Sequence, residues 1–393
     1  MKILVQWGAG NIGRSFIGQL FARNGYKVVF VDIDMNLVQA LNKAGRYEVR
    51  HLSFGTEKSL SVEGVSAVDG RDDSAVIEQI VAADYVSFSV GLNVLPRVMP
   101  LLAKALERRV CIRPDVPLDI IIAENIHDGA AFIRNLLKIY LPEDFAFEKH
   151  VGLVETCIGK MVPIQRGNDP LVVYGEPFNT LIVDKKGFLG PVPSFAGIQA
   201  VTPISAYVER KLWLHNMGHA AAAYLGFKRV PERRLLAEVL TDTHVYETVK
   251  KAMYQATDVL RKRWPNVFTA EGLISDADDL LHRFQNLALG DTVYRVGRDL
   301  KRKLRFDDRL MGLIVTAVEN HAEWDAVAEA YAAAFSFTAT DSDGLAFAPD
   351  SQFLASLSHL SGEEKVKAAA QFSESTISQE TISHIVSVIA AKL

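Results

Sequence analysis

The sequence predicts an α/β protein whose first part is a parallel, doubly wound sheet and whose second part is mostly α-helical. Up to about residue 160, short apolar runs rich in β-forming residues alternate with helix-like segments. The runs are almost wholly apolar, as in strands buried on both faces, and cover residues 3–7, 28–31, 85–90 and 120–123. Beyond about residue 203 the strand signals fade and helical periodicity dominates.

The two halves meet in a segment rich in turn-forming residues. Residues 171–184 read "LVVYGEPFNTLIVD", which we predict to be a pair of strands around a Gly-Glu-Pro turn. Gly and Pro are frequent in the stretch that follows. A chain of 393 residues also exceeds the usual size of a single hydrophobic core. We therefore predict a first domain over residues 1–195 and a helical second domain over residues 196–393.

Composition and charge describe an ordinary globular chain. Hydrophobic residues make up 49% and charged residues 23%, and the net charge of -4 offers no basic excess for nucleic-acid binding. The first apolar run is too short for a signal peptide or a membrane span, so we expect no membrane association. Cys111 and Cys157 lack the paired spacing of zinc sites, which suits a reducing cytoplasm. Nothing marks a subunit interface, and the oligomeric state stays open.

A glycine-rich run follows the first predicted strand directly. It extends from Gly8 to Gly13 as "GAGNIG", the G-x-G-x-x-G pattern between a strand and a helix. Gly8 would form the tight turn, Gly10 would let a pyrophosphate approach the backbone, and Gly13 would allow close helix packing. The helix N-terminus would face the phosphates, and Asn11 and Ile12, within the run, belong to the predicted cofactor site.

An acidic residue indicates which dinucleotide binds. The second apolar run ends at Asp32, about 20 residues beyond the glycines. A carboxylate there can accept hydrogen bonds from the adenosine ribose and repel a 2′-phosphate, so we predict NAD rather than NADP. The alternative is a purely structural glycine turn, and the strand, the helix and the carboxylate in their expected places all weigh against it.

Two further positions follow predicted strands at the carboxyl edge of the sheet, where open α/β sheets bind ligands. Asn125 stands just past a buried run in "IIIAENIHDG", and its neutral amide can orient a substrate oxygen. Taken alone, it is equally typical of an Asx turn or a helix cap. Val90 and Gly91 end the "YVSFSV" run and can border the nicotinamide, or they can form an ordinary turn at the end of a strand.

The stretch "ERKLWLHNMGHAAAAY" carries the most informative residues of the second half. In a regular α-helix Lys211, Asn216 and His219 fall within an arc of about 140° and share one face. A lysine with a lowered pKa can take the proton of an alcohol, while an amide and an imidazole hold the developing alkoxide. The alternative is an amphipathic helix with a solvated lysine and a core histidine.

The same helix offers a rival interpretation as a metal site. His215 and His219 are four residues apart, as in the zinc-protease helix. The sequence shows no recognisable third ligand and no H-E-x-x-H motif. We therefore predict no metal.

A basic stretch, "YRVGRDLKRKL", lies further along the chain. On a continuous helix Arg295, Arg298 and Arg302 lie within about 60° of one another, with Lys303 adjacent. Guanidinium groups on one face suit bidentate capture of a phosphate or a carboxylate. The alternative is a solvated basic face.

With these residues together, the sequence resembles the polyol-specific long-chain dehydrogenase/reductase family over nearly its whole length. The shared stretches include "GAGNIGRSFIG", "VFVDID", "IIAEN", "HVGLVE", "RVGRDLKRKL" and, most specific, the K-x4-N-x2-H helix. The resemblance implies a Rossmann domain carrying an antiparallel extension, followed by a helical substrate domain. It also implies metal-independent hydride transfer between NAD and C5 of a sugar phosphate, which interconverts mannitol 1-phosphate and fructose 6-phosphate.

The family's site residues carry over by position. Lys211 would be the general acid/base, and Asn216 and Asn125 would hold the reacting oxygen. His219 would bind the substrate. The basic stretch from Arg295 to Lys303 would face the substrate phosphate.

The chain departs from the family pattern at two places, the pair Gly159 and Lys160 and the single residue His215. Gly159 and Lys160, in "CIGKMVP", replace an acidic-basic pair near the cofactor, so either another group such as Glu155 completes the site or the activity is altered. His215 replaces a residue that is usually apolar. An imidazole beside Lys211 can further lower the pKa of that lysine, or it can face solvent.

The prediction from sequence is therefore an NAD-dependent polyol phosphate dehydrogenase with Lys211 as the base. Its partners would be a small sugar phosphate or polyol, with no nucleic acid. A sugar-acid oxidoreductase acting on tagaturonate or fructuronate is the main alternative, since arginines bind a carboxylate nearly as well as a phosphate. A non-catalytic NAD-binding sensor is a further alternative, which the change at Gly159 and Lys160 keeps open.

Overall fold

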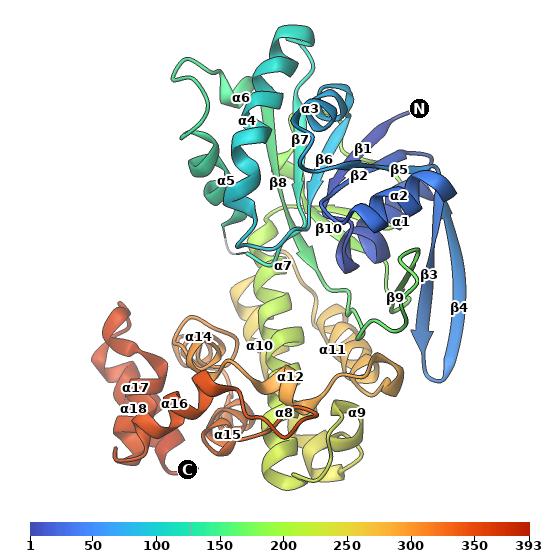
Figure 1. Ribbon diagram of the computed structural model, residues 1–393. Helices are drawn as coiled ribbons and strands as arrows, with labels where there is room; N and C mark the ends of the chain where they lie inside the picture. The colour runs from blue at the N-terminus through green and yellow to red at the C-terminus, as the bar shows by residue number, and fades with distance from the viewer. Residues whose placement is uncertain (127) are drawn as a thin grey trace. The chain divides into compact units, whose positions relative to one another are not determined.

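The computed structural model describes residues 1–126 and 128–393, which form two compact units, Met1–Tyr207 and Val208–Leu393 (Figure 1). The division falls inside helix α7 (Ile204–Arg210). The predicted boundary at residue 195 precedes strand β11 (Ile198–Val201), which still belongs to the sheet of the first unit.

The first unit is built on an eight-stranded sheet with the order β11-β10-β8-β7-β6-β1-β2-β5. Its strands besides β11 are β1 (Ile3–Trp7), β2 (Lys27–Asp32), β5 (Val65–Asp69), β6 (Tyr85–Phe88), β7 (Leu118–Ile122), β8 (Val151–Ile158) and β10 (Leu181–Asp184). All pairs from β8 to β5 are parallel, and β10 runs antiparallel to β8. The predicted parallel sheet with an antiparallel extension is thus confirmed. The strand order reverses between β1 and β6, the place where such sheets bind ligands.

Helices cover both faces of this sheet, as the apolar runs predicted (Figure 1). They are η1 (Gly13–Gly18), α1 (Gln19–Ala22), α2 (Met35–Ala44), α3 (Asp73–Ala82), α4 (Leu95–Ile112), α5 (Gly129–Leu137), α6 (Phe147–His150) and the short turn η2 (Lys185–Gly187). Successive side chains of a strand point to opposite faces, so Leu4 packs in the core beneath α1 and α2 while Val5 packs in the core beneath α3, α4 and α5.

A second, three-stranded sheet has the order β4-β3-β9 and corrects one prediction. Its strands are β3 (Arg46–Ser53), β4 (Thr56–Glu63) and β9 (Val172–Gly175). We predicted β9 and β10 to pair around the Gly-Glu-Pro turn, and this is wrong. β9 instead pairs in parallel with β3, where Val173 joins Tyr47, Val49 and Val62 in one buried cluster.

The second unit is helical, which confirms the prediction for this half. It contains η3 (Lys211–Asn216), α8 (Met217–Arg229), α9 (Leu236–Val239), α10 (Thr243–Arg263), α11 (Ala270–Phe284), η4 (Leu287–Leu289), α12 (Val293–Gly297), α13 (Leu300–Lys303), α14 (Met311–Glu319), α15 (Asp325–Ala333), η5 (Ala334–Ser336), α16 (Ala348–Leu357), α17 (Gly362–Ala370), η6 (Phe372–Glu374) and α18 (Gln379–Ala390). The buried alanines 220–223 of α8 let α10, α12 and α15 pack closely against it. Within the described part of the chain, we find no helix with the length and apolarity needed to span a bilayer.

Candidate functional site

The glycine-rich run forms a loop whose geometry fits a dinucleotide. Gly8 has a φ of +92°, and a Cβ there would lie 2.5 Å from the carbonyl oxygen of Ser89. A Cβ at Gly13 would lie 2.0 Å from the Gly8 oxygen, whereas a Cβ at Gly10 would meet no atom within 4 Å. Gly8 and Gly13 are therefore required by the turn itself. Gly10 faces open space, which is what the approach of a pyrophosphate needs.

The helix after this loop starts with a π-helical segment, which we did not predict. In η1 the N–H of Gln19 donates to the carbonyl of Arg14, five residues earlier. The guanidinium of Arg14 is buried and donates from Nε to the Ala9 oxygen at 2.6 Å, and burial lowers the pKa of Arg14. The Tyr47 hydroxyl donates to the Arg14 carbonyl at 2.7 Å. The buried Arg14 side chain thus stabilises the glycine loop through its hydrogen bond to Ala9, whereas Asn11 in the same loop is exposed.

Asp32 joins the end of β2 to the glycine loop. Its Oδ2 accepts a hydrogen bond from the Ala9 N–H at 2.7 Å, and its Oδ1 accepts from the Asp34 N–H at 3.0 Å. A carboxylate oxygen can accept more than one hydrogen bond, so this pairing leaves capacity for a ribose hydroxyl. Asp32 lies at the position the prediction requires, and its ribose contact stays a prediction.

A carboxylate connects the ends of β6 and β7. Glu124 Oε1 accepts hydrogen bonds from the N–H groups of Val90 and Gly91 at 2.6 and 2.8 Å, and burial raises the pKa of Glu124. Asn125, the next residue, is exposed on the same carboxyl edge. The structure therefore brings these predicted positions to one border. The role of Glu124 was missed, although its place directly after a buried run was a usable signal.

Of the pair Gly159 and Lys160, which departs from the family pattern, Gly159 is partly exposed and Lys160 is enclosed. Lys160 is buried, donates to the carbonyl of Phe178 at 2.9 Å, and lies 5.4 Å from the centre of the Phe16 ring. Glu155, which we considered as a replacement group, accepts a hydrogen bond from Ala130 N–H at 2.9 Å, in the first turn of α5. Glu155 therefore caps a helix.

In the second unit, the lysine and the asparagine lie on a π-helical turn. The segment η3 spans Lys211–Asn216, and the N–H of Met217 donates to the Leu212 carbonyl, five residues earlier. The assumption of a regular α-helix is therefore wrong here. In a π turn the hydrogen bonds join residues five apart, so residues five apart lie more nearly above one another than in an α-helix. Lys211 and Asn216 are five apart, and the angle between them around the axis is therefore smaller than we predicted. Isolated π turns are frequent at functional sites.

The burial of side chains along this helix fits the prediction that Lys211, Asn216 and His219 share one face. Lys211, Asn216 and His219 are each partly exposed. The side chains between them are largely buried, and this buried set includes Trp213, Leu214, His215, Met217 and Gly218. The three predicted side chains thus share the less buried face of one helix.

The imidazole of His219 contacts a carboxylate and an aromatic ring, and it is neutral at physiological pH. Its Nε2 lies 3.1 Å from Asp291 Oδ2, and its ring stacks on Phe284 with centres 4.8 Å apart. Although a carboxylate is adjacent, burial, followed by the charges of Arg295 and Lys303, lowers the pKa of His219 to about 3. Burial and the basic side chains around the ring disfavour a protonated imidazole more than the single carboxylate favours it.

His215 is buried beside His219. Their rings meet edge to face at 5.7 Å, and burial lowers the pKa of His215 well below its usual value. His215 therefore does not face solvent. Among the described residues, no group of three or more His, Cys, Asp or Glu side chains is arranged to hold a metal.

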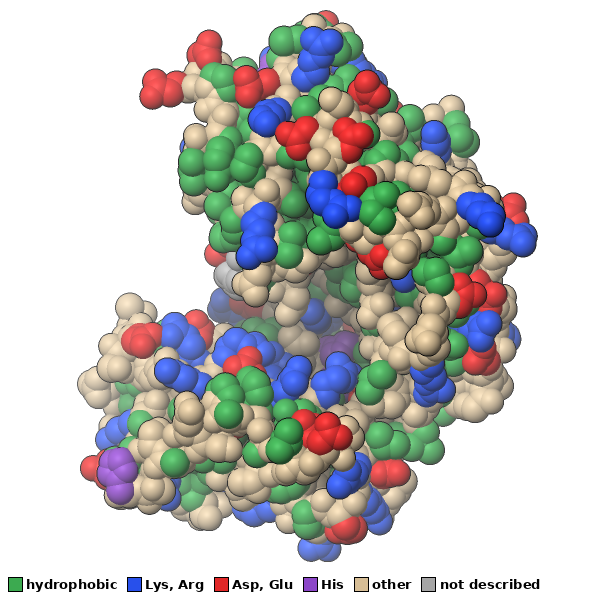
Figure 2. All heavy atoms as spheres, in the orientation of Figure 1, with side chains coloured by type: hydrophobic (Ala, Val, Ile, Leu, Met, Phe, Trp, Pro, Cys, Tyr) green, Lys and Arg blue, Asp and Glu red, His purple; other side chains and the backbone are tan. Residues whose placement is uncertain are grey.

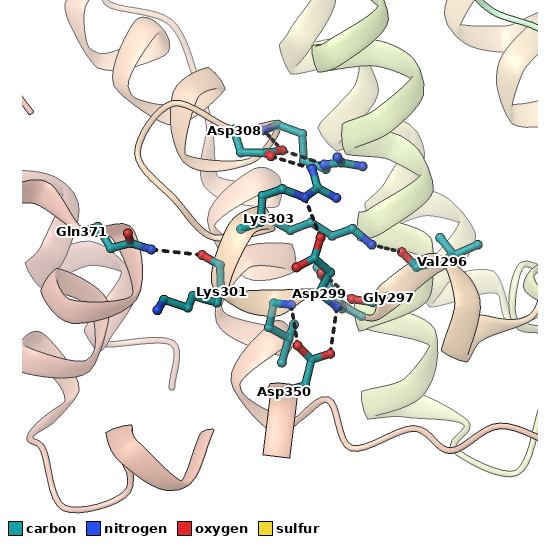
Figure 3. A network of polar contacts seen from close by, with 12 residues as sticks. Val296, Gly297, Asp299, Lys301, Lys303, Asp308, Asp350 and Gln371 are labelled. Atoms are coloured by element: carbon teal, nitrogen blue, oxygen red, sulfur yellow. Dashed lines mark hydrogen bonds and ion pairs between the residues drawn. The ribbon is translucent and has the colours of Figure 1, made fainter. Parts of the chain in front are cut away.

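The basic stretch is not one helix, which corrects our prediction. α12 ends at Gly297 and α13 starts at Leu300, and between them Asp299 has a φ of 77°. The break is stabilised by Asp350, whose buried carboxylate accepts hydrogen bonds from the N–H groups of Asp299 and Leu300 at 2.9 and 2.7 Å (Figure 3). A Cβ at Gly297 would lie 2.1 Å from the Phe337 ring, so the turn also requires glycine.

The four predicted cations have different partners. Arg295 pairs with Asp291, and Arg302 pairs with Asp299 and with Asp308. Figure 2 shows Lys and Arg side chains gathered along one border of the helical unit. The charges of Arg295 and Arg302 are therefore already compensated by nearby carboxylates.

Arg298 and Lys303 have other surroundings. Arg298 lies 5.6 Å from the ring centres of both Tyr294 and Phe347 and, within residues 1–126 and 128–393, pairs with no carboxylate. Lys303 is buried and donates to the Val296 carbonyl at 2.6 Å (Figure 3). Arg298 is thus the member of the set whose charge is available to a ligand.

Replacing Lys303 with methionine is expected to change how stability depends on pH. Burial, then the charges of Arg309 and Arg302, lower the pKa of Lys303 from 10.5 to about 7. Between these values the unfolded chain binds more protons, so the contribution of this lysine to the free energy of unfolding rises with pH, by about 1 kcal/mol per unit. Urea unfolding of both proteins between about pH 7 and 10 should show this rise in the wild type alone. Parallel curves would contradict the lowered pKa.

Comparisons with known proteins agree with this architecture. Residues 1–197 match the family model described as the mannitol dehydrogenase Rossmann domain, and residues 203–392 match the mannitol dehydrogenase C-terminal domain. A D-sorbitol dehydrogenase in substrate-free form shares the fold with 15% identity, a TM-score of 0.79, and coverage of 99% of this chain and 94% of that chain. Pseudomonas fluorescens mannitol 2-dehydrogenase, in ternary complex with NAD and D-mannitol, is similar with 18% identity, a TM-score of 0.72, and coverage of 100% and 90%.

Proposed function

The chain belongs to the mannitol dehydrogenase family, as its resemblance to polyol dehydrogenases predicted, and from this premise we propose that it is a mannitol-1-phosphate 5-dehydrogenase. It would interconvert mannitol 1-phosphate and fructose 6-phosphate with NAD. The observation that supports a phosphorylated substrate is the exposed guanidinium of Arg298, which has no carboxylate partner among the described residues. A guanidinium left uncompensated suits bidentate binding of a phosphate.

The glycine loop and Asp32 would hold the cofactor, because Gly10 borders open space and Asp32 keeps capacity for a ribose hydroxyl. When bound, a nicotinamide supplies the hydride acceptor for oxidation and the hydride donor for reduction. Val90 and Gly91 are positioned by Glu124 at the strand ends, where the reacting end of the cofactor is expected.

Lys211 would transfer the proton. In oxidation its neutral amine accepts the hydroxyl proton of the substrate, and in reduction the ammonium returns a proton to the carbonyl oxygen. Asn216 and Asn125 would donate amide hydrogen bonds to that oxygen as negative charge develops on it. His219, neutral at physiological pH, would bind a neighbouring hydroxyl group. The proton acceptor, the proton donor and the hydrogen-bonding groups of these steps are all side chains of the chain itself.

NADH consumption with four sugars tests the proposal. We expect oxidation of NADH with fructose 6-phosphate, little with fructose, and no loss of rate when a chelator is added. Activity with tagaturonate or fructuronate alone would show that the arginine binds a carboxylate, and the protein would be a sugar-acid reductase. NADH binding, seen by fluorescence, without oxidation with any of the four would indicate a sensor.

Arg298→Leu is expected to raise the KM for fructose 6-phosphate by at least about 10-fold, because a charged hydrogen-bond donor to the phosphate is lost. The KM for fructose should stay within about two-fold of the wild type. Arg302→Leu is the matched control, since Arg302 is already paired with Asp299 and Asp308. It should lower the melting temperature and change both KM values alike. Equal effects of Arg298→Leu on both sugars would remove its phosphate role.

A further inference from the structure

A buried carboxylate connects two of the predicted substrate-binding side chains. Asp291 is 9% exposed, its Oδ2 lies 3.1 Å from His219 Nε2, and its Oδ1 pairs with a terminal nitrogen of Arg295. We did not single out Asp291 from the sequence. Its spacing of one helical turn before Arg295 is the signal that was available.

The position of Asp291 is fixed by the backbone, independently of the two side chains it contacts. Its carbonyl accepts a hydrogen bond from Leu236 N–H at 2.8 Å, and the N–H of Val293 donates to the Arg234 carbonyl at 2.8 Å. Leu235 and Thr292 form an isolated antiparallel bridge between these two bonds. The carboxylate is therefore presented from a rigid support on which His219 and Arg295 can be aligned.

The imidazole of His219 has little freedom to choose another arrangement. Phe284 stacks on its face and His215 meets it edge-on, so the ring is confined to one plane. The charged groups around it are Arg283, Arg295, Lys303, Arg309 and Asp291. Since the ring is neutral, it carries one N–H, and a carboxylate can only accept a hydrogen bond from it. The proton therefore belongs on Nε2, and Nδ1 keeps its lone pair.

We propose that Asp291 is a positioning residue that holds His219 in its Nε2–H tautomer, with Nδ1 as a hydrogen-bond acceptor for a hydroxyl group of the substrate. This inference rests on the proposed function. His219 is 16% exposed at its side chain, so the ring is not fully enclosed. The second oxygen of Asp291 aligns Arg295 as a donor and compensates its charge. A hydroxyl group both donates and accepts, so a fixed acceptor beside a fixed donor recognises a polyol hydroxyl rather than an anion.

Nitrogen NMR of the full-length, ¹⁵N-histidine-labelled protein tests the tautomer without any need for activity. We expect a His219 signal of the Nε2–H form that does not titrate between about pH 6 and 9, assigned by its loss in His219→Gln. Asp291→Asn should keep this form, since an amide oxygen can still accept. Asp291→Ala should convert it to a mixture of tautomers. An Nδ1–H form in the wild type, or no change in Asp291→Ala, would overturn the proposal.

Kinetics separate positioning from simple structural support. Asp291→Asn keeps the histidine bond but loses the charge that aligns Arg295, so we expect KM for fructose 6-phosphate to rise about 10-fold with kcat changed less than about three-fold. Asp291→Ala should lower kcat/KM by about 100-fold. Asp325→Asn is the control, because Asp325 pairs with Lys251 and Gln255 elsewhere in the unit and should leave KM unchanged.

The outcomes distinguish failure of this inference from failure of the proposed function. A wild-type protein inactive with all sugars would contradict the function, while the NMR result would still decide the tautomer. If Asp291→Asn and Asp291→Ala lowered only the melting temperature and the folded fraction, with KM and the histidine signal unchanged, Asp291 would be a structural residue and the inference would be wrong.

Discussion

Lys211→Ala is expected to lower turnover by about 1000-fold while the affinity for NADH stays within about two-fold of the wild type. The lysine would move a proton only in the transition state, so its loss removes stabilisation that the ground state does not use. NADH is expected to bind through the glycine loop and Asp32 in the first unit, whereas Lys211 lies in the second. Its removal should therefore leave cofactor binding intact.

Single-turnover kinetics and NADH fluorescence titration would measure the two effects separately. Lys211→Arg keeps the positive charge but cannot release its proton near neutral pH, so it should be as inactive as the alanine variant if proton transfer is the role. Lys228→Ala, an exposed position on α8, is the matched control and should retain full turnover. Substantial activity in Lys211→Arg would mean that charge alone is needed, and wild-type turnover in Lys211→Ala would exclude this lysine as the base.

The setting of Lys211 shows how far sequence reasoning reaches. Residue types and spacing singled out Lys211, Asn216 and His219 as candidates, and their roles stay predictions. Their shared helix face was predictable, because all three fall on one face with either kind of helical turn. The π turn itself was not predictable. Periodicity is read at a fixed angle per residue, and a local change to hydrogen bonds five residues apart leaves no mark in composition.

Some features of the two sheets were likewise predictable from the sequence and others were not. Strands such as β1 and β7 were predicted because burial on both faces requires nearly continuous apolar runs. β4 was missed because most of its side chains are exposed or only partly buried, which leaves little apolar signal. β9 and β10 were recognised as strands, yet their partners depend on β3 and β8, which are distant in the sequence. Local patterns predict elements better than they predict pairing.

The prediction of a single helix for the basic stretch is wrong for a related reason. Arginine spacing predicted a single helix, but the N–H groups freed by the break at Asp299 are satisfied by Asp350, which lies far along the chain. Glu124, Arg14 and Asp291 were likewise missed, since each contacts a group that is distant in the sequence: the Val90 N–H, the Pro170 carbonyl and the His219 ring, respectively. Buried polar groups need partners, and the partner's place is set by tertiary structure.

Gly10→Ala and Gly13→Ala are expected to impair NADH binding for different reasons, and together they test whether the loop is a cofactor site. A Cβ at Gly10 would occupy open space in the free protein, so the fold should be unaffected. The added methyl would stand where a pyrophosphate must approach the backbone, and the affinity for NADH should fall by about 10- to 100-fold.

Gly13→Ala should instead damage the loop itself. Its Cβ would lie 2.0 Å from the carbonyl oxygen of Gly8, a backbone atom that cannot yield without moving the turn. Overpacking of this kind costs about 1–3 kcal/mol, so the melting temperature should fall along with NADH affinity. Calorimetry and fluorescence titration on both variants distinguish the two roles. A pyrophosphate bound against Gly10 cannot share that space with a methyl group. If Gly10→Ala bound NADH like the wild type, the loop would therefore be only a structural turn.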